Sequence, residues 1–228
     1  DDMEDRICFP EIDTFIRAVI KRETGYLKEL EEYAKLNHIP IVAPETAALL
    51  KVLINIHKPH RILEAGTAIG YSSAVMAGVM PEDGIIDTIE IDEDMAERAE
   101  QNIVQMGLEK RIRILTGDAL EIMQCLTTGY DMIFLDAAKG QYIEYYPPAF
   151  RLLNPEGLLI SDNVLYKGLV AREETVFHKH RTIALKLREY LDKICGDDRL
   201  QTAVIPIGDG MAVSFKKSNP EKSNSGNS

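Results

Sequence analysis

The sequence has few cysteines, no long apolar run and no excess of positive charge. Its three cysteines, Cys8, Cys125 and Cys195, are widely separated and form no C-x-x-C pair. An odd number of isolated cysteines indicates neither a disulfide framework nor a zinc site, so we expect reduced thiols. No apolar stretch approaches the length that crosses a bilayer, and the acidic N-terminus lacks the basic and apolar segments of a signal peptide. We therefore expect no membrane association and a cytoplasmic protein.

Several catalytic signatures are also missing. The five histidines are scattered and no H-E-x-x-H occurs, so metal ligation by histidine is not indicated. The chain has neither a G-x-S-x-G nucleophile turn nor a phosphate-binding P-loop. The net charge of −11 argues against broad, non-specific nucleic-acid binding, although it is compatible with a local basic surface.

The length predicts a single folded unit. With 228 residues, of which 45% are hydrophobic and 28% charged, the chain suffices for one α/β domain with a full core but not for two. We expect one domain over residues 1–217, with N-terminal helices in residues 1–57. The polar, serine- and asparagine-rich residues 218–228 predict a disordered tail.

The hydrophobic pattern predicts the fold class. Apolar positions recur at helical spacing through residues 10–36, with an interruption at Gly25, and a further helix starts at Pro44. From Arg61 onward, strand-like and helix-like segments alternate, which predicts a parallel sheet with helices on both faces. The last two strands are joined by too few residues for a helix, so they predict an antiparallel hairpin at one edge. The predicted fold is α/β: a Rossmann-like, doubly wound, mostly parallel seven-stranded sheet with an antiparallel terminal hairpin and N-terminal capping helices. After the first strand, the expected order is strand 85–90, helix 95–106, strand 112–115, helix 119–126, strand 130–136, helix 142–153, strand 157–163, and the hairpin strands 200–207 and 211–217.

The central motif is RILEAGTAIGYSSAVMA, in which a short strand ends at Glu64 and a turn bounded by Gly66 and Gly70 leads into a helix. The turn lacks the middle glycine of the dinucleotide fingerprint, which lets the backbone approach a pyrophosphate. A ligand without phosphates fits better, and S-adenosylmethionine carries cationic groups that favour a nearby carboxylate. Glu90 closes the next strand about twenty residues later, the spacing at which a βαβ unit places an acid on a ribose. The alternative, a packing turn without a ligand, is less favoured once this second acid is counted.

Further acidic residues follow the strands at the edge where open α/β sheets bind ligands. Asp136 ends an apolar strand, and Asp162 and Asn163 end its expected neighbour, so three hard oxygen donors are predicted to converge. Such donors suit Mg²⁺. Lys139 lies three residues after Asp136 and is a candidate proton acceptor beside the cation. The alternatives are that the carboxylates only cap helices and that Lys139 is a solvated surface residue.

With these motifs the sequence resembles the class I S-adenosylmethionine-dependent, cation-dependent O-methyltransferases that include the catechol and caffeoyl-CoA enzymes, over about residues 38–216. The segments that carry the resemblance are LEAGTAIGYSS, TIEID, GDAL, FLDAAKGQY and ISDNVLYKG. It implies S-adenosylmethionine and Mg²⁺ or Mn²⁺ as cofactors, with Lys139 as the catalytic lysine beside Asp136. It places the cation on Asp136, Asp162 and Asn163. The cofactor site that it implies is lined by Ile41, Glu64, Gly66, Ser72, Glu90, Asp118, Ala119 and Asp136.

Within that family, DAAKGQY, DNVLYKGLVA and IPIGDGMA resemble most the bacterial tRNA 5-hydroxyuridine methyltransferases, which make 5-methoxyuridine at the wobble position. The resemblance implies a tRNA anticodon arm as partner and a homodimer, to which the exposed edge of the terminal hairpin would contribute. Residues 167–193, which follow the predicted metal ligands, contain seven basic and four acidic residues. We expect phosphate contacts there and stacking of a displaced base on an aromatic ring. The expected acceptor-side residues are Tyr166, Lys167, Lys179 and Arg181.

Other interpretations stay open at this point. A small-molecule catechol-type enzyme would use the same chemistry, because catechol and 5-hydroxyuridine both present two neighbouring oxygens to a metal. A dinucleotide-binding oxidoreductase is disfavoured by the missing middle glycine. A non-enzymatic binding module would need neither the oxygen donors nor the lysine. For residues 167–193, the alternative is an amphipathic helix with an ordinary solvated face.

Overall fold

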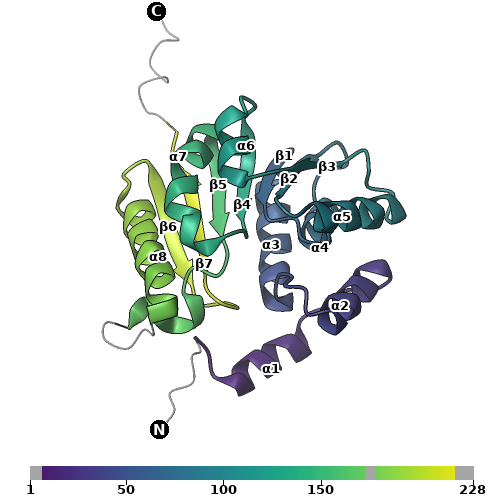
Figure 1. Cartoon of the computed structure of the whole chain (residues 1–228), viewed down its shortest axis with the longest axis horizontal. Helices are drawn as coiled ribbons and strands as arrows, with labels where there is room; N and C mark the ends of the chain where they lie inside the picture. Colours follow the sequence, from purple (N-terminus) through teal and green to yellow (C-terminus); the bar gives the residue numbers. More distant parts are fainter. Residues whose placement is uncertain (1–6, 173–177, 219–228) are drawn as a thin grey trace, which may run out of the picture.

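A computed structural model describes residues 7–172 and 178–218, without the side chains of residues 178 and 179. Its centre is a seven-stranded sheet with the strand order β3-β2-β1-β4-β5-β7-β6 (Figure 1). The first five strands are parallel, and β7 is antiparallel to both of its neighbours. The predicted mostly parallel α/β sheet is confirmed. The strands are β1 (Arg61–Ala65), β2 (Ile85–Glu90), β3 (Ile112–Thr116), β4 (Tyr130–Leu135), β5 (Leu153–Ser161), β6 (Leu200–Ile205) and β7 (Met211–Lys216).

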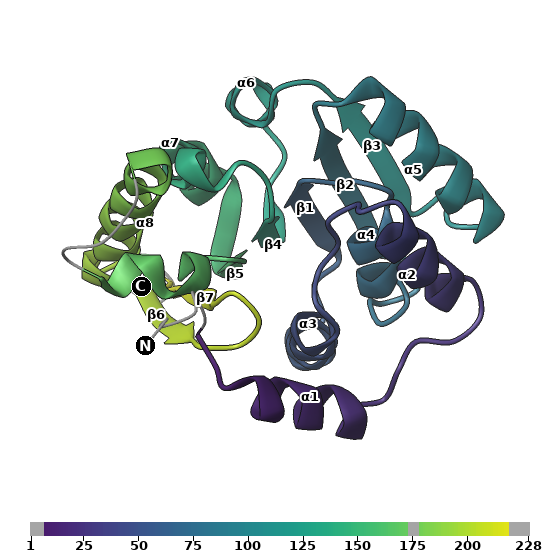
Figure 2. The same ribbon diagram turned by 60° about the horizontal axis from the view of Figure 1, so that its bottom comes forward.

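Helices cover both faces of the sheet (Figure 2). On one face, α2 to α5 contribute to a buried cluster that includes Ile62 and Ile86. On the other, α6, α7 and α8 pack around residues such as Leu63 and Ile133. The inner strands are buried on both sides, which is why their sequences are nearly continuous apolar runs. The helices are α1 (Pro10–Val19), α2 (Tyr26–Leu36), α3 (Pro44–His57), α4 (Tyr71–Ala77), α5 (Glu93–Gln105), α6 (Ala119–Cys125), α7 (Tyr142–Leu152) and α8 (His178–Gly196), with 3-10 turns η1 (Lys139–Gln141) and η2 (Tyr166–Ala171).

The predicted antiparallel hairpin is formed by β6 and β7. β7 lies between β5 and β6, with Val213 opposite Ile160 of β5 and Ala203 of β6. The hairpin turn consequently reaches the carboxyl end of β5, where the Gly210 carbonyl accepts a hydrogen bond from the Val164 N–H at 3.0 Å. This contact brings a late segment of the chain to the ligand-binding edge of the sheet.

The two predicted N-terminal amphipathic helices are both present but differ in burial. α2 contributes Leu30 and Ala34 to the core. α1 buries none of its residues, and it contacts α3 through an ion pair in which Arg17 donates to both carboxylate oxygens of Glu45 at 2.7 and 2.8 Å. The core is thus capped by α2 and α3, while α1 lies outside it.

One strand boundary differs from the prediction. β5 begins at Leu153, directly after α7, rather than at Gly157. Its first residue pairs with Tyr130 before a register shift between Tyr130 and Met132. Glu156, inside the shifted segment, has a φ of +66°. A bulge of this kind lengthens the strand through residues that the hydrophobic pattern marks as a turn.

Three further expectations concern membrane-spanning helices, the cysteines and the C-terminal tail. No helix in residues 7–172 or 178–218 is both long and apolar enough to cross a membrane. The three cysteines are unpaired, as the sequence predicts. Residues 219–228 of the predicted tail lie outside the described residues.

Candidate active site

The ends of β4 and β5 bring the two predicted aspartates side by side. The Asp136 N–H donates to the Ala65 carbonyl at the end of β1 (2.8 Å), and the Asp162 N–H donates to the Leu135 carbonyl (3.0 Å). These bonds continue the sheet by one residue past each strand. The Tyr142 hydroxyl of α7 donates to the carbonyls of Leu135 and Asp162, at 3.0 and 3.1 Å, and so links the ends of β4 and β5.

A cavity of about 700 Å³ lies along this edge, from the ends of β2 and β3 to the end of β5. Its wall also receives residues from α1, from the loop before α3 and from the β6–β7 turn. Glu64, Lys139 and the expected acceptor-side residues Tyr166, Lys167 and Arg181 are not part of the wall. The sequence-predicted residues that do line it are Ile41, Gly66, Ser72, Glu90, Asp118, Ala119, Asp136, Asp162 and Asn163.

The cavity wall is strongly acidic. Six of its described residues carry carboxylates, and Arg17 is the only basic residue among them. Such an excess of negative charge favours cationic ligands and disfavours a pyrophosphate. The six acidic residues are Glu90, Asp92, Asp118, Asp136, Asp162 and Asp209.

Gly66 is required by close packing at this edge. Its φ is +105°, and a Cβ atom there would lie 2.2 Å from the Asp136 carbonyl oxygen. The N–H groups of Gly66 and Thr67 both donate to the Ile89 carbonyl of β2, at 2.9 and 3.2 Å. The turn is therefore held tightly between β2 and β4, which explains its first glycine without any phosphate ligand.

Glu64 lies beneath the cavity rather than in its wall. Its carboxylate is fully buried and accepts hydrogen bonds from the hydroxyls of Ser72 (2.5 Å), Thr88 (2.6 Å) and Ser73. Burial raises the pKa of Glu64 in spite of these three donors. The sequence analysis places Glu64 at the cofactor, and in the structure the side chain that reaches the cavity from this cluster is Ser72.

Glu90 and Asp118 line the opposite end of the cavity and also have structural partners. Glu90 accepts from the Ala68 N–H (2.7 Å) and from the Asp92 N–H (3.0 Å). Asp118 accepts from the Glu121 N–H at 3.0 Å and so caps α6. The helix-cap interpretation is thus correct for Asp118, and it does not exclude a ligand contact by the second carboxylate oxygen.

Asp136, Asp162 and Asn163 bring oxygen donors to the same edge of the cavity; Asp162 is buried, and Asp136 and Asn163 are half-buried. One oxygen of Asp162 accepts from the Asn163 N–H at 2.7 Å. Among the described residues, neither Asp136 nor Asp162 has a basic partner within 4.0 Å. Burial raises the pKa of Asp162 to about 6, and burial together with the neighbouring Asp162 raises the pKa of Asp136 well above its usual range. A divalent ion would offset the repulsion between these two neighbouring carboxylates, so the donor set fits such an ion.

Lys139 lies at the side of this cluster, at the start of η1. Its Nζ is 3.5 Å from Oδ2 of Asp209 and 5.8 Å from the centroid of the Tyr166 ring. Asp209 lies in the β6–β7 turn and lines the cavity. The sequence analysis assigned no role to Asp209, although it used the surrounding segment IPIGDGMA for the family resemblance. The available signal was an acid between two glycines in the turn that joins the hairpin strands.

Arg17 is a second residue that sequence reasoning missed. The amphipathic pattern of α1 places it on the polar face, with no indication that this face meets the cavity. In the structure Arg17 donates hydrogen bonds to the carboxylate of Glu45, which is only 2% exposed. Glu45 also acts on Asp162, whose pKa its charge raises, so the ion pair lies close to the oxygen donors.

The basic segment that was predicted to bind phosphates is only partly available. Lys186 donates to Glu144 at 2.8 Å, and Arg188 donates to the Val170 carbonyl at 2.5 Å. Arg181 is exposed on α8. The side chain of Lys179 lies outside the described residues.

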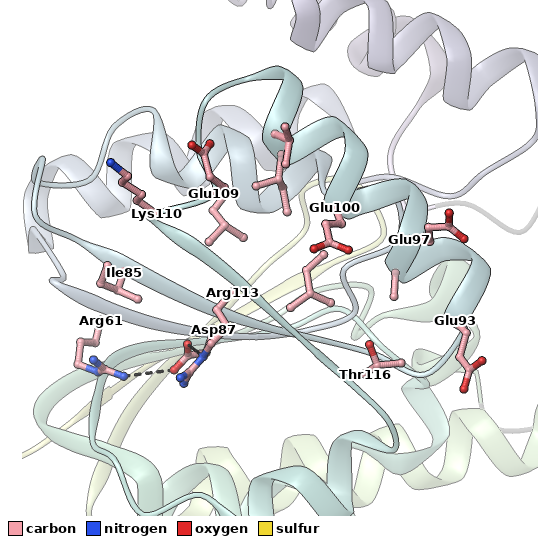
Figure 3. Close-up of a pocket in the computed structure, with 15 residues that line it drawn as sticks. Arg61, Ile85, Asp87, Glu93, Glu97, Glu100, Glu109, Lys110, Arg113 and Thr116 are labelled. Atoms are coloured by element: carbon pink, nitrogen blue, oxygen red, sulfur yellow. Dashed lines mark hydrogen bonds and ion pairs between the residues drawn. The ribbon is translucent and has the colours of Figure 1, made fainter.

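A second hollow, of about 830 Å³, lies between α5 and β3 (Figure 3). None of the predicted site residues lines it. Its buried acid, Asp87, is already neutralised by Arg61 (3.2 Å) and Arg113 (2.9 Å) and accepts from the Tyr130 hydroxyl at 2.7 Å. With its buried acid already paired and none of the predicted site residues in its wall, this hollow is not the candidate active site.

Comparisons with known proteins agree with the geometry. The O-methyltransferase family matches residues 18–217. The caffeoyl-CoA O-methyltransferase of Stellaria longipes is 30% identical over 206 residues, which cover 85% of this chain and 84% of that enzyme. The catechol O-methyltransferase of Niastella koreensis is 38% identical over 138 residues, which span 59% of this chain and 62% of that enzyme. The structure of an O-methyltransferase from Bacillus cereus in complex with SAH is 26% identical, with a TM-score of 0.81, and the match covers 91% of this chain and 97% of that one.

Proposed function

This chain belongs to the O-methyltransferase family and is an S-adenosylmethionine-dependent enzyme, and from that premise we propose that it methylates 5-hydroxyuridine at the tRNA wobble position with the help of a divalent cation. The observation that supports cation-assisted methyl transfer is a cavity in which an acid-lined crevice adjoins the oxygen donors of Asp136, Asp162 and Asn163. The choice of tRNA as acceptor rests on sequence segments and charge. Cofactor and cation would then meet at the acceptor oxygen. The product would be 5-methoxyuridine.

The cofactor is proposed to lie along the glycine turn, from Ser72 to Ala119. Glu90 would accept hydrogen bonds from the ribose hydroxyls, since it ends β2 and lines the cavity. Glu64 would act through Ser72, whose hydroxyl it holds at 2.5 Å. The remaining contacts are assigned to Ile41, Gly66, Asp118, Ala119 and Asp136, all of which line the same cavity.

Replacement of Glu90 by alanine is expected to weaken S-adenosylmethionine binding by about 1–3 kcal/mol, the usual cost of losing a charged hydrogen-bond partner. Titration calorimetry measures this, and Glu97→Ala, an exposed change on α5, is the matched control. Because Glu90 also holds the Ala68 N–H, unfolding curves must confirm that the variant is folded. Unchanged cofactor affinity in a folded Glu90→Ala protein would remove Glu90 from the ribose site.

Asp136, Asp162 and Asn163 would hold Mg²⁺ or Mn²⁺. When bound, such a cation supplies a Lewis acid that favours the ionised form of the acceptor hydroxyl and orients a second, neighbouring oxygen. Lys139 would accept the proton, because it is the basic residue nearest to these donors along the chain. Asp209, which lines the cavity and is 3.5 Å from the Lys139 Nζ, would hold the lysine near the site.

The choice of tRNA as acceptor is supported by three sequence segments and by charge. DAAKGQY, DNVLYKGLVA and IPIGDGMA are those that resemble the tRNA 5-hydroxyuridine enzymes. In 5-hydroxyuridine the reacting hydroxyl adjoins a carbonyl, so the two oxygens can chelate one cation as in catechol. Residues 167–193 follow the proposed metal ligands and carry a net positive charge in a chain that is otherwise acidic, so those basic residues that remain unengaged would dock phosphates near the site.

Reversing two of these charges tests the docking surface. Lys179→Glu combined with Arg181→Glu is expected to raise the apparent KM for tRNA about tenfold at low salt, because phosphate contacts are lost, and to leave cofactor affinity unchanged. The matched control, Lys28→Glu with Lys110→Glu, makes the same change in net charge at exposed positions away from α8. An equal rise in KM for both double variants would show a general charge effect and not a docking site.

The second candidate is a small-molecule enzyme. Two relatives favour it, because their names, catechol O-methyltransferase and caffeoyl-CoA O-methyltransferase, describe enzymes with small-molecule acceptors. The cavity fits this candidate equally well, because the oxygen donors require only two vicinal oxygens in the acceptor.

We also propose that residues 1–217 form one domain and that the protein is a homodimer. The edge strand β6 and the apolar side chains of α1 and its N-cap offer surface that a second copy would cover; Phe9, Phe15 and Val19 are 70%, 66% and 63% exposed. Light scattering at low micromolar concentration measures the mass, and a monomer there would count against the dimer.

A further inference from the structure

Tyr166 lies in a strained segment directly after the metal-binding residues. Its φ is +45° and that of Lys167 is +56°, a left-handed conformation that is unfavourable for a residue with a side chain. The β6–β7 turn holds this segment in place. The Asp209 carbonyl accepts from the Leu165 N–H at 3.1 Å, and the Asp209 carboxylate accepts from the Lys167 N–H. The backbone is therefore fixed so that the ring of Tyr166 has one defined direction.

The ring itself is held between two side chains. On one side, the Lys139 Nζ lies 5.8 Å from the ring centroid. On the other, the Tyr166 hydroxyl is 2.5 Å from Nδ1 of His180, and the two rings are 5.6 Å apart with an interplanar angle of 54°. The aromatic ring thus adjoins the proposed proton acceptor and is tied at its far end to α8.

We propose that His180 is a positioning residue that fixes the ring of Tyr166 beside Lys139, at the side of the cavity, so that the ring can contact an acceptor that extends beyond the cavity wall. This inference rests on the proposed function, because it assigns a role in acceptor binding. A planar aromatic or heteroaromatic acceptor would pack against the ring of Tyr166. α8 also carries the basic residues proposed to dock phosphates, so the same helix would position both the polyanion and the ring that receives its base.

The direction of the hydrogen bond follows from the chemistry of the two groups. A phenol is protonated at neutral pH, so the Tyr166 hydroxyl donates. His180 then accepts at Nδ1 and carries its own proton on Nε2. Asparagine at position 180 would offer an amide oxygen near the place of Nδ1, whereas phenylalanine would keep the ring and remove the acceptor.

The test is a double-mutant cycle on the full-length protein, with the acceptor that the wild type methylates. His180→Phe and Tyr166→Phe should each lower kcat/KM about fivefold to tenfold, mainly through the acceptor KM, the effect expected for one hydrogen bond. The double variant should lose no more than either single one. His180→Asn should retain most of the wild-type value, and Thr182→Ala, an exposed neighbour on α8, should match the wild type. Affinity for S-adenosylmethionine should stay unchanged throughout.

Losses that multiply in the double variant, equal losses of cofactor affinity, or an unchanged KM in His180→Phe would each overturn the proposal. An independent readout needs no acceptor. With ¹⁵N-labelled histidine, the protein has only five histidines to resolve, and His180 should show an unprotonated Nδ1 whose resonance moves in Tyr166→Phe. If the wild type methylates none of the acceptors offered, the proposed function fails, but this spectrum still tests the contact between His180 and Tyr166. A His180 resonance that does not move in Tyr166→Phe refutes that contact.

Discussion

Excess EDTA is expected to abolish methyl transfer, and Mg²⁺ or Mn²⁺ is expected to restore it. The reason is the neighbouring pair Asp136 and Asp162, which has no basic partner within 4.0 Å among the described residues and whose carboxyl pKa values are raised by loss of solvation. A cation between them would keep both carboxylates ionised and would favour the ionised acceptor oxygen. We expect a loss of several kcal/mol of transition-state stabilisation, or about 10³-fold in rate.

Asp162→Asn should behave like the chelated wild type. The change keeps the shape of a side chain that is 2% exposed but removes one charge from the oxygen cluster. The variant should still bind S-adenosylmethionine with wild-type affinity, which serves as the control for folding. Rates are measured by methyl transfer from labelled cofactor, and residual metal by elemental analysis. Full activity in metal-free protein would remove the cation from the account.

Lys139→Ala should bind cofactor and cation normally yet turn over about 10²- to 10⁴-fold more slowly, the range expected for loss of a general base. Lys139 lies three residues after Asp136, and its Nζ is 3.5 Å from Asp209. Asp209→Asn should lower kcat by a smaller factor, because it orients Lys139 without receiving the proton. The measurement is kcat at saturating acceptor with separate calorimetric titrations of cofactor and Mn²⁺.

Lys110→Ala, an exposed lysine away from the cavity, is the control for the loss of one positive charge. An increase in acceptor KM with unchanged kcat in Lys139→Ala would show that the lysine binds the acceptor rather than taking its proton. Equal activities of Lys139→Ala and the wild type would return Lys139 to the surface-residue interpretation.

The sheet and its ligand-binding edge could be predicted because they depend on short-range patterns. Strands that are buried on both faces have nearly continuous apolar sequences. The residue that ends each apolar run therefore lies at the carboxyl edge of the parallel sheet. Asp136 and Asp162 are adjacent in the structure for that reason, through backbone bonds of 2.8 and 3.0 Å at the ends of β4 and β5. The glycine turn was recognised by the same logic, although Gly66 is explained by its approach to Asp136.

Contacts between segments far apart in the chain could not be predicted. Asp209 reaches Lys139 because β7 inserts between β5 and β6, which no local pattern reveals. Arg17 reaches the cavity because it pairs with Glu45, 28 residues further along the chain. Similarly, a count of basic residues cannot show that Lys186 is bound to Glu144 and that Arg188 is bound to a backbone carbonyl. Charge patterns indicate which residues can bind a partner, and only the fold shows which of them are already engaged.

The most direct test of the central claim is transfer of a labelled methyl group to competing acceptors. Purified protein, labelled S-adenosylmethionine and Mg²⁺ are incubated with tRNA that contains 5-hydroxyuridine, with the same tRNA lacking that nucleoside, and with a panel of catechols. The account predicts that label enters the hydroxyuridine-containing tRNA, is recovered as 5-methoxyuridine after digestion, and disappears with EDTA. Efficient labelling of a catechol with none in either tRNA would contradict the tRNA assignment and make the protein a small-molecule O-methyltransferase.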